Sequence, residues 1–436
     1  MINVQCSMEK TDLIIIGAGP GGYRAAEYAA KQGLKVVIFE GSEVGGTCLN
    51  VGCIPTKTYV HSATFAEARE RMSQVVPQLR SGVEGLLSHP NITLIREKAS
   101  FENHGDRPCD SSVAEIMGTV PVILAGEETY TAPNIIIATG SETKWLPIEG
   151  ARTDPRVVDS TGLLNLETLP KRLTIIGAGV IGMEFASVFN HFGSEVTVIE
   201  YLKECLPALD SDIAKRLRKT LEKRGITFKM KTAVQNLADI DADVILMATG
   251  RKPRTEGLNL DTLGITLTPQ GAIPVNENYQ AGDGIYAIGD VNGKQMLAHA
   301  AEAQAISVVK QIVNCKSSNC KFLDIMPAAI FTEPEAACVG PTEDQLKEKN
   351  IPYVCKKSFW RANGKALAMK ETEGMLKLFA TPAGEILGAH AYGAHSADII
   401  QEVSVLMCKH TTLSELADMV HIHPTLSEIL KSAAEN

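Results

Sequence analysis

Asp12-Leu-Ile-Ile-Ile-Gly17-Ala-Gly19-Pro-Gly-Gly22 decides the fold, because an apolar run ends here in a glycine turn. The run predicts a buried strand, and the residues after it, 23–32, have the pattern of a helix. Gly33 ends this helix, and residues 34–40 read as a second strand. The order strand, glycine turn, helix, strand predicts a βαβ-type unit of an α/β fold.

Each glycine of the turn has a separate physical task. Gly17 permits the tight turn, Gly19 lets the backbone approach a pyrophosphate, and Gly22 lets helix and strand pack closely. The helix N-terminus attracts phosphate charge, and Glu40 at the end of the second strand can accept a hydrogen bond from a ribose hydroxyl. The pattern favours a dinucleotide site; a single such motif can also be a glycine-rich turn in a nucleotide-free domain.

The same plan occurs a second time, over 173–200. Gly177, Gly179 and Gly182 repeat the three glycines, and Glu200 follows Gly177 by 23 positions, as Glu40 follows Gly17. Two matched copies make the nucleotide-free alternative much less favourable. Glu200 would repel a 2′-phosphate, and no arginine cluster follows it in residues 201–205, so we expect NAD rather than NADP at the second site.

Later apolar strands in both copies end in Ala-Thr-Gly, at Gly140 and Gly250. The second unit is therefore inserted after most of the first has been built. Beyond residue 326, short strands expected at 332–335, 374–379 and 386–391 precede helices expected at 396–408 and 413–420, which indicates an α+β module. We expect domains at 1–150, 151–275 and 326–436, with 276–325 as a central segment that completes the first site.

Composition and charge limit the function classes. The chain has 436 residues, of which 44% are hydrophobic and 21% charged, and its net charge is −9. Nucleic-acid binders neutralise phosphates with basic residues, so this balance disfavours a nucleic-acid partner. No apolar run of about 18 residues is present, and residues 1–10 lack the apolar core of a signal peptide. These features predict a cytoplasmic protein without a membrane span.

Two cysteine pairs share the spacing Cys-x4-Cys: Cys48/Cys53 and Cys315/Cys320. The second lies in the polar stretch 314–320, which we interpret as a linker with incidental thiols. The first lies in Gly45-Gly-Thr-Cys48-Leu-Asn-Val-Gly-Cys53-Ile-Pro-Thr-Lys57, directly after the first nucleotide unit. We expect no metal site.

A disulfide between Cys48 and Cys53 requires a distorted helix. Five residues of an ideal helix rise about 7.5 Å, near or beyond the Cα separation that a disulfide bridges. Gly52 and Pro55 allow or mark such a distortion. A strained, accessible disulfide is reducible, as redox catalysis requires, and Lys57 would favour a thiolate. The alternative is a pair of unbridged core cysteines.

Segment 45–57, the two glycine fingerprints and Gly284-Ile-Tyr-Ala-Ile-Gly-Asp290 together resemble the flavoprotein pyridine nucleotide–disulfide oxidoreductases, across essentially the whole chain. The resemblance implies two Rossmann-like dinucleotide-binding domains, the first for FAD and the second for NAD, and a C-terminal α+β dimerisation domain. It also implies that Asp290 contacts the flavin's ribityl chain and that Lys57 lies beside the flavin in an ion pair with Glu184. The expected cofactor-binding residues are Gly17, Gly19, Gly22, Glu40, Lys57, Gly140, Gly177, Gly179, Gly182, Glu184, Glu200, Gly250 and Asp290.

The C-terminal His421-Ile-His423-Pro-Thr-Leu-Ser-Glu428 resembles the dihydrolipoyl dehydrogenase branch of this family. The resemblance implies His423 as catalytic base and Glu428 as the carboxylate that orients it, roles that suit an imidazole titrating near neutral pH. It further implies that Cys48 exchanges with substrate and that Cys53 faces the flavin. His421 is expected to have no chemical role.

The function implied is oxidation of protein-bound dihydrolipoamide, with electrons passing through Cys48–Cys53 and FAD to NAD+. The implied partners are a second copy, which would join Cys48 to His423 across a two-fold interface, and a lipoyl-bearing acyltransferase or similar lipoyl protein. One departure is that segment 59–101 is shorter than the family usually has. The alternatives are an NAD(P)H-dependent disulfide or metal reductase of the same family, and a non-catalytic flavin scaffold, which the intact Cys48, Cys53 and His423 disfavour.

Overall fold

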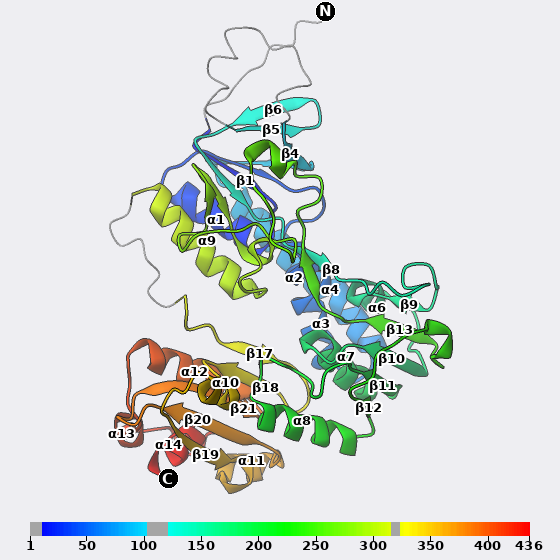
Figure 1. The fold of residues 1–436 in the computed structure, drawn as a ribbon, viewed down its shortest axis with the longest axis vertical. Helices are drawn as coiled ribbons and strands as arrows, with labels where there is room; N and C mark the ends of the chain where they lie inside the picture. The colour runs from blue at the N-terminus through cyan, green and yellow to red at the C-terminus, as the bar shows by residue number, and fades with distance from the viewer. Residues whose placement is uncertain (1–10, 103–120, 315–322) are drawn as a thin grey trace, which may run out of the picture. The chain divides into compact units, whose positions relative to one another are not determined.

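The computed structural model describes residues 11–102, 121–314 and 323–436 (Figure 1). The expectations for residues 1–10 and for Cys315 and Cys320 fall outside these ranges. The chain forms two compact units, the first from 1–55, 70–142 and 251–323, the second from 56–69, 143–250 and 324–436. Within the described ranges, no helix is both long and apolar enough to cross a bilayer.

The first unit is built on a six-stranded sheet in the order β15-β16-β7-β1-β2-β3. Its strands are β1 (Leu13–Ile16), β2 (Val36–Phe39), β3 (Ile92–Ile95), β7 (Asn134–Ile137), β15 (Gln280–Gly282) and β16 (Ile285–Ala287). All four residues of β1 are buried, and β1 runs parallel to both β2 and β7. A parallel strand covered on both faces reads as a continuous apolar run, which is why 12–16 predicted it correctly.

Alternate residues of β1 enter two different cores. Leu13 and Ile15 pack into the cluster with α1 (Pro20–Lys31) and α9 (Ala298–Ile312), which lie side by side in Figure 1. Ile14 and Ile16 pack into the opposite cluster with the antiparallel sheet of β4 (Ala99–Phe101), β5 (Val122–Ala125) and β6 (Glu128–Thr131). The remaining elements that lie wholly or partly in this unit are α2 (Gly46–Val51), α3 (Cys53–Val60), α4 (Phe65–Leu87), β8 (Ser141–Thr143), β14 (Arg251–Pro253), η2 (Leu260–Leu263) and η3 (Gly289–Asn292); α3, α4 and β8 also include residues of the second unit.

The second unit contains a five-stranded parallel sheet that repeats the plan of the first. Its order is β12-β11-β10-β13-β9, with β10 pairing in parallel with β11 and β13 as β1 pairs with β2 and β7. The elements are β9 (Val157–Val158), α6 (Ser160–Leu164), β10 (Arg172–Ile176), α7 (Val180–His191), β11 (Glu195–Ile199), α8 (Ser211–Lys223), β12 (Thr227–Lys229), η1 (Leu237–Asp239) and β13 (Val244–Met247). The predicted internal repeat is therefore confirmed strand by strand.

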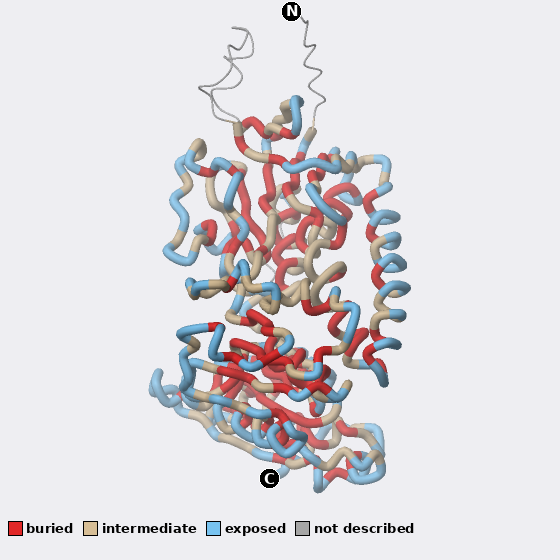
Figure 2. Tube along the Cα trace, turned by 90° about the vertical axis from the view of Figure 1, so that its right-hand side faces the viewer, coloured by how far each residue is buried: buried red, intermediate tan, exposed pale blue. Residues whose placement is uncertain are grey.

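The C-terminal part of this unit is an antiparallel sheet in the order β17-β18-β21-β20-β19, with α12 packed on β18 and β21. Residues of β20 and β21 are mostly buried; Figure 2 colours buried residues red and exposed residues pale blue. The elements are β17 (Ala328–Ile330), β18 (Ala336–Val339), α10 (Glu343–Glu348), β19 (Val354–Phe359), η4 (Trp360–Ala362), α11 (Gly364–Met369), β20 (Met375–Ala380), β21 (Ile386–Tyr392), α12 (Ser396–Cys408), α13 (Leu413–Asp418) and α14 (Glu428–Glu435).

One expected strand is wrong. Residues 332–335 form the connection between β17 and β18, and it contains a cis Glu333–Pro334 bond. Proline has no N–H to give to a strand ladder, and the Thr332 hydroxyl donates locally to the Pro334 carbonyl oxygen at 2.7 Å. The expected strands at 374–379 and 386–391 and the helix at 396–408 are confirmed as β20, β21 and α12.

A buried group of charges links the N-terminus of α8 to the antiparallel sheet of the second unit. Lys377, 1% exposed, places Nζ 2.7 Å from Asp210 Oδ1 and 2.6 Å from Glu343 Oε2. Asp210 is the N-cap of α8, and its backbone N–H donates to His390 Nδ1 at 3.0 Å. Burial lowers the pKa of His390 to about 4, so the ring is neutral at pH 7 and can accept this bond. Strands β20 and β21 are thus tied to the first turn of α8.

Candidate functional site

The first glycine turn has a shape that side chains would prevent. Gly17 has φ +101°, and a Cβ on it would lie 2.5 Å from the Ala138 carbonyl oxygen. A Cβ on Gly22 would lie 1.8 Å from the Gly17 carbonyl oxygen. A Cβ on Gly19 would meet no atom closer than 3.9 Å, so the space before the N-terminus of α1 is open. An anionic group can approach this helix end directly.

The second turn reproduces this geometry. Gly177 has φ +107°, and its Cβ would lie 2.4 Å from the Ala248 carbonyl oxygen. A Cβ on Gly182 would lie 2.0 Å from the Gly177 carbonyl oxygen, whereas one on Gly179 would meet nothing within 4 Å. Both helix N-termini therefore keep an open approach of the kind that a pyrophosphate requires.

The two strand-end glutamates are held by their own loops. Glu40 accepts the N–H groups of Ala18 at 2.8 Å and Ser42 at 2.9 Å. Glu200 accepts those of Ala178 at 2.6 Å and Leu202 at 2.7 Å. Each carboxylate is fixed beside its glycine turn, and its remaining lone pairs can accept ribose hydroxyls. The donors and open space at both sites fit a dinucleotide.

The strand-end glycines complete the two loops. Gly140 and Gly250 adopt φ of +73° and +105°, and a Cβ on either would meet nothing within 4 Å. Their carbonyl oxygens accept the N–H groups of Arg254 and Lys144, respectively. A left-handed backbone, rather than crowding, therefore favours glycine at both positions.

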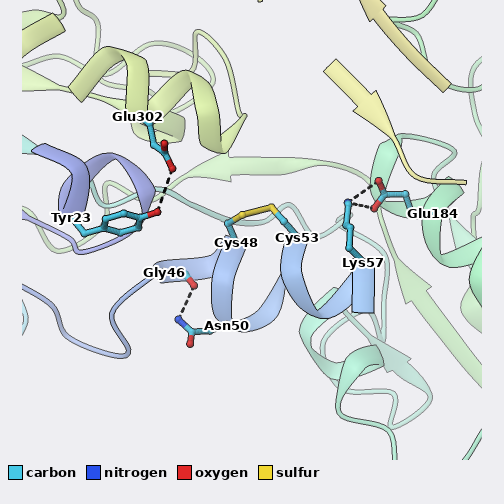
Figure 3. The surroundings of a disulfide bond; sticks show 8 residues. All are labelled: Tyr23, Gly46, Cys48, Asn50, Cys53, Lys57, Glu184 and Glu302. Atoms are coloured by element: carbon cyan, nitrogen blue, oxygen red, sulfur yellow. Dashed lines mark hydrogen bonds and ion pairs between the residues drawn. A yellow bond between two sulfur atoms is a disulfide. The ribbon is translucent and has the colours of Figure 1, made fainter. Parts of the chain in front are cut away.

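Cys48 and Cys53 form a disulfide between α2 and α3 (Figure 3). The helix breaks at Gly52, and the two Cα atoms lie 4.6 Å apart, which confirms the expected distortion. A Cβ on Gly52 would lie 2.9 Å from the Thr47 carbonyl oxygen. Pro55 occupies the first turn of α3, where a missing N–H removes no helix hydrogen bond. Both cysteines are half-buried, as an exchangeable disulfide requires.

Lys57 of α3 points to Glu184 of α7 (Figure 3). Its Nζ lies 2.9 and 2.8 Å from the two carboxylate oxygens. Glu184 is 4% exposed and also accepts the Phe331 N–H at 2.9 Å, while Nζ lies 4.6 Å from the centre of the Phe331 ring. The buried carboxylate is thus paired, as its burial demands.

Asp290, in η3, accepts a hydrogen bond from the Ser141 hydroxyl. Arg251 donates to the hydroxyl oxygen and to the carbonyl oxygen of Ser141, both at 2.7 Å. Ser141 is 2% exposed, so the Asp290 carboxylate is held by a buried contact. Ser141 and Arg251 were missed from the sequence, although each directly follows one of the two Ala-Thr-Gly strand ends, at Gly140 and Gly250.

His423 and Glu428 form a second polar pair. His423 Nδ1 lies 2.9 Å from Glu428 Oε1, and Glu428 Oε2 accepts the Thr425 N–H at 2.9 Å. The His423 side chain is 78% exposed. His421, in contrast, is 7% exposed and lies with Nε2 3.1 Å from Glu402, a structural contact.

The predicted residues thus form local groups. Cys48 and Cys53 belong to the first unit and are joined by the disulfide, whereas His423 and Glu428 belong to the second and are joined by a hydrogen bond. In the part of the chain that the structure describes, the free cysteines are Cys205, Cys338, Cys355 and Cys408. Burial raises the pKa of Cys338 to about 11 and that of Cys205 further, so both thiols are protonated and unreactive.

The described ranges contain no group of three or more His, Cys, Asp or Glu side chains arranged to hold a metal ion.

Asn50, between the two cysteines, was also missed from the sequence. Its side-chain amide donates to the carbonyl oxygens of Val44 and Gly46, each at 2.9 Å (Figure 3 shows the Gly46 bond). Its position between the two cysteines of the Cys-x4-Cys segment is the sequence feature that could have identified it as part of the site.

Residues 11–305 match the family pyridine nucleotide-disulphide oxidoreductase, and residues 326–434 match the dimerisation domain of that family. A mitochondrial dihydrolipoyl dehydrogenase of Pisum sativum is 37% identical over 98% of this chain and 91% of its own length. A leghemoglobin reductase of Glycine max is 36% identical over 98% of this chain and 87% of its own length. The Cu(II) complex of the HOCl-induced flavoprotein disulfide reductase RclA from Escherichia coli matches with TM-score 0.89 and 32% identity, over 98% of this chain and 99% of that one.

Proposed function

The chain belongs to the pyridine nucleotide-disulphide oxidoreductase family, and we propose that it is a dihydrolipoyl dehydrogenase that passes electrons from dihydrolipoamide to NAD+. The observation that carries this proposal is the Cys48–Cys53 disulfide across the break between α2 and α3, half-buried and therefore open to thiol exchange. The His423–Glu428 pair and the identity to the Pisum sativum enzyme support the choice of branch.

Family membership confirms the predicted fold class, with FAD and a pyridine nucleotide as cofactors. We propose that Gly17, Gly19, Gly22 and Glu40 hold FAD, with Asp290 on its ribityl chain and Lys57–Glu184 beside its ring. Gly177, Gly179, Gly182 and Glu200 would hold NAD, and Gly140 and Gly250 would close the two sites. When bound, FAD would supply two-electron transfer between the cysteine pair and NAD+.

The chain's own residues would carry the thiol chemistry. A thiolate of the substrate dithiol attacks Cys48 Sγ, the Cys48–Cys53 bond breaks, and Cys53 leaves as a thiolate. The second substrate thiol then displaces Cys48, so that substrate leaves as a cyclic disulfide and the protein as a dithiol. His423 Nε2 takes the proton that the substrate loses, because Nδ1 is engaged with Glu428.

The dimerisation-domain match supports a homodimer. We propose that a second copy covers Val420 and Ile422, which are 95% and 79% exposed on either side of His421, and so brings His423 of one protomer to Cys48 of the other. Exposed apolar side chains of this size indicate a surface that is covered in the assembly. A lipoyl-bearing acyltransferase or similar lipoyl protein would supply the substrate in the cytoplasm.

The proposed division of labour follows the predicted domains. Residues 1–150 and 276–325 would bind FAD, residues 151–275 would bind NAD, and residues 326–436 would form the interface. The fixed Glu200 carboxylate supports NAD over NADP, because a 2′-phosphate would meet a negative charge.

A second candidate is an NAD(P)H-dependent disulfide or metal reductase. It is favoured by the likeness to the E. coli protein, whose printed name is a flavoprotein disulfide reductase and whose structure is a Cu(II) complex. Such an activity would take the metal ion as substrate at Cys48 and Cys53.

Steady-state assays separate these candidates. We expect NADH formation from NAD+ and dihydrolipoamide to exceed, in kcat/KM, both NADPH oxidation with glutathione disulfide and NADH oxidation with Cu(II). All three activities should be lost in Cys53→Ser if they share the disulfide. A higher kcat/KM for Cu(II) or glutathione disulfide would replace the dehydrogenase proposal with the reductase.

A further inference from the structure

An arginine outside every recognised motif contacts the redox turn. Arg80 lies on α4, and its Nε donates to Asn50 Oδ1 at 2.9 Å. Its Nη1 lies 3.4 Å from Glu43 Oε1. Asn50 is in α2 between the two cysteines, and Glu43 is in the loop that leads into α2. One guanidinium therefore binds the redox helix and the loop before it.

The donor chemistry of arginine fixes the orientation of the Asn50 amide. A guanidinium only donates hydrogen bonds, so Oδ1 of Asn50 must face Arg80. The NH2 group then faces the opposite side, where it donates to the carbonyl oxygens of Val44 and Gly46. We call this set of bonds among Arg80, Asn50, Val44 and Gly46 the Arg80–Asn50 clasp.

The loop that the clasp holds is flexible by composition. Gly45 and Gly46 have φ of +91° and +60°, two successive left-handed residues with little intrinsic stiffness. The same loop meets the first glycine turn, because the Gly45 N–H donates to the Ala18 carbonyl oxygen and a Cβ on Gly46 would lie 2.7 Å from the Gly19 Cα. At its other end α2 stops at Gly52, so the clasp restrains a six-residue helix with a glycine at each border.

We propose that Arg80 is a positioning residue of the redox centre: through Asn50 it holds Cys48 at bonding distance from Cys53 when the disulfide is reduced. The inference rests on the proposed function only in that the Cys48–Cys53 couple turns over. Without the clasp, α2 can move against α3 about Gly52, and the reduced thiols lose their preset approach.

This role predicts the sign of a shift in redox equilibrium. In the exchange, two molecules of glutathione reduce Cys48–Cys53 to two thiols and become one glutathione disulfide. Loosening the dithiol makes closure of the disulfide less favourable, so reduction becomes easier and the potential less negative. A role for Arg80 through its positive charge alone would give the opposite sign, because removing a cation disfavours the thiolate of the reduced form.

The test uses the purified holoenzyme in glutathione redox buffers, with acid quenching, alkylation and mass spectrometry of the peptide that contains Cys48 and Cys53. We expect Arg80→Met to raise the equilibrium constant for reduction about tenfold, or about 30 mV. Asn50→Leu should give a shift of the same sign and size. The double variant should shift no further than the larger single variant, since both remove one clasp. Arg80→Lys, which keeps the charge and one donor, should shift less in the same direction.

Arg96→Met is the matched control. Arg96 also contacts α4, because its Nη2 donates to Glu84 Oε1 at 2.6 Å. Among the described residues, Arg96 makes no hydrogen bond or ion pair with α2. The equilibrium constant for reduction of Cys48–Cys53 in Arg96→Met should equal that of the wild type. An unchanged or more negative potential in Arg80→Met, or additive shifts in the double variant, would overturn the proposal. If Arg80→Met does not accumulate, the potentials of Asn50→Leu and Arg80→Lys provide the test, and both should be less negative than that of the wild type. The titration needs neither dihydrolipoamide nor NAD+, so a wild type inactive on dihydrolipoamide would refute the proposed function alone.

Discussion

The carboxylate of Glu428 fixes which nitrogen of His423 is free for chemistry. Its hydrogen bonds from the Thr425 N–H and from His423 lower the pKa of Glu428, so the carboxylate is ionised at neutral pH. An ionised carboxylate only accepts hydrogen bonds, and Nδ1 of His423 must therefore carry the ring proton. In the neutral tautomer that results, Nε2 is the nitrogen with a free lone pair, as a general base requires.

If His423 is that base, His423→Gln should slow the dithiol half-reaction by about 10²–10⁴-fold. The dithiol half-reaction of Glu428→Gln should have a rate between those of the wild type and His423→Gln, because this change weakens the orientation of the imidazole ring without removing the ring. Flavin reduction by NADH should change far less, since it needs no imidazole. Stopped-flow measurement of the two half-reactions checks this, with His421→Gln as the matched control that keeps the dithiol rate. A similar loss in both half-reactions would speak against the base role.

Mixed protomers test whether the site is shared between two chains. Heterodimers of inactive Cys48→Ser and His423→Gln protomers contain one intact pair if the residues meet across the interface. We expect such heterodimers to recover up to half of the wild-type dithiol activity per dimer. Heterodimers confirmed by mass that recover none would show that each site lies within one chain.

The two cysteines should differ by spectroscopy. We expect two-electron reduction to produce a long-wavelength thiolate–flavin charge-transfer band that survives Cys48→Ser and is absent in Cys53→Ser. The reason is that only the sulfur next to the flavin can donate into it. Anaerobic titration with dithionite provides the spectra, and Cys408→Ser, a free half-buried cysteine, is the control. A band that needs Cys48 and tolerates Cys53→Ser would reverse the two roles.

Glu200 should set the nucleotide preference. Glu200→Ala removes the acceptor for a ribose hydroxyl and the repulsion of a 2′-phosphate, so the kcat/KM for NAD+ should fall about tenfold. The preference for NAD+ over NADP+ should narrow accordingly. Glu195→Ala, an exposed position on the same strand β11, should leave both values unchanged. Equal wild-type kcat/KM for the two nucleotides would contradict the NAD assignment.

His390 should make stability depend on pH. Burial lowers the pKa of its ring from 6.5 to about 4, with the Asp210 carboxylate opposing the shift and Lys377 adding to it. The stability it contributes is present above pH 6.5 and is lost as the pH falls to about 4, an effect of about 3 kcal/mol. Between pH 6.5 and 4, the midpoint of thermal unfolding (Tm) of His390→Asn should therefore fall less than the Tm of the wild type. His410→Asn, a 77% exposed histidine, should retain the full decline.

Local constraints explain what the sequence could predict. At Gly17 and Gly177, nearby backbone carbonyl oxygens leave no room for a Cβ, so only glycine fits. The spacing of the glycines within each motif was therefore enough to identify both turns. The redox disulfide followed from its own thirteen-residue segment in the same way. The error at 332–335 arose because the expected strand contains Pro334, which has no N–H to give to a strand ladder.

Contacts between distant segments carry no such local pattern. Arg80 reaches Asn50 over 30 residues, and Lys377 reaches Asp210 over 167. Nothing in the neighbourhood of Arg80 separates it from Arg69 or Arg71 on the same helix. Only the folded chain shows which of these arginines meets the redox turn.

The charges buried between α8 and strands β20 and β21 restrict how this protein can be recombined with its relatives. The two family matches meet between residues 305 and 326, which makes that junction an obvious place to graft a foreign C-terminal module. Such a graft replaces Glu343, Lys377 and His390 together but leaves Asp210. A module without a lysine at 377 would leave the buried Asp210 carboxylate without its cation, and one without a histidine at 390 would remove the acceptor of the Asp210 N–H. A module grafted at this junction must therefore supply a lysine and a histidine at the positions of Lys377 and His390, because Asp210 comes from the other parent.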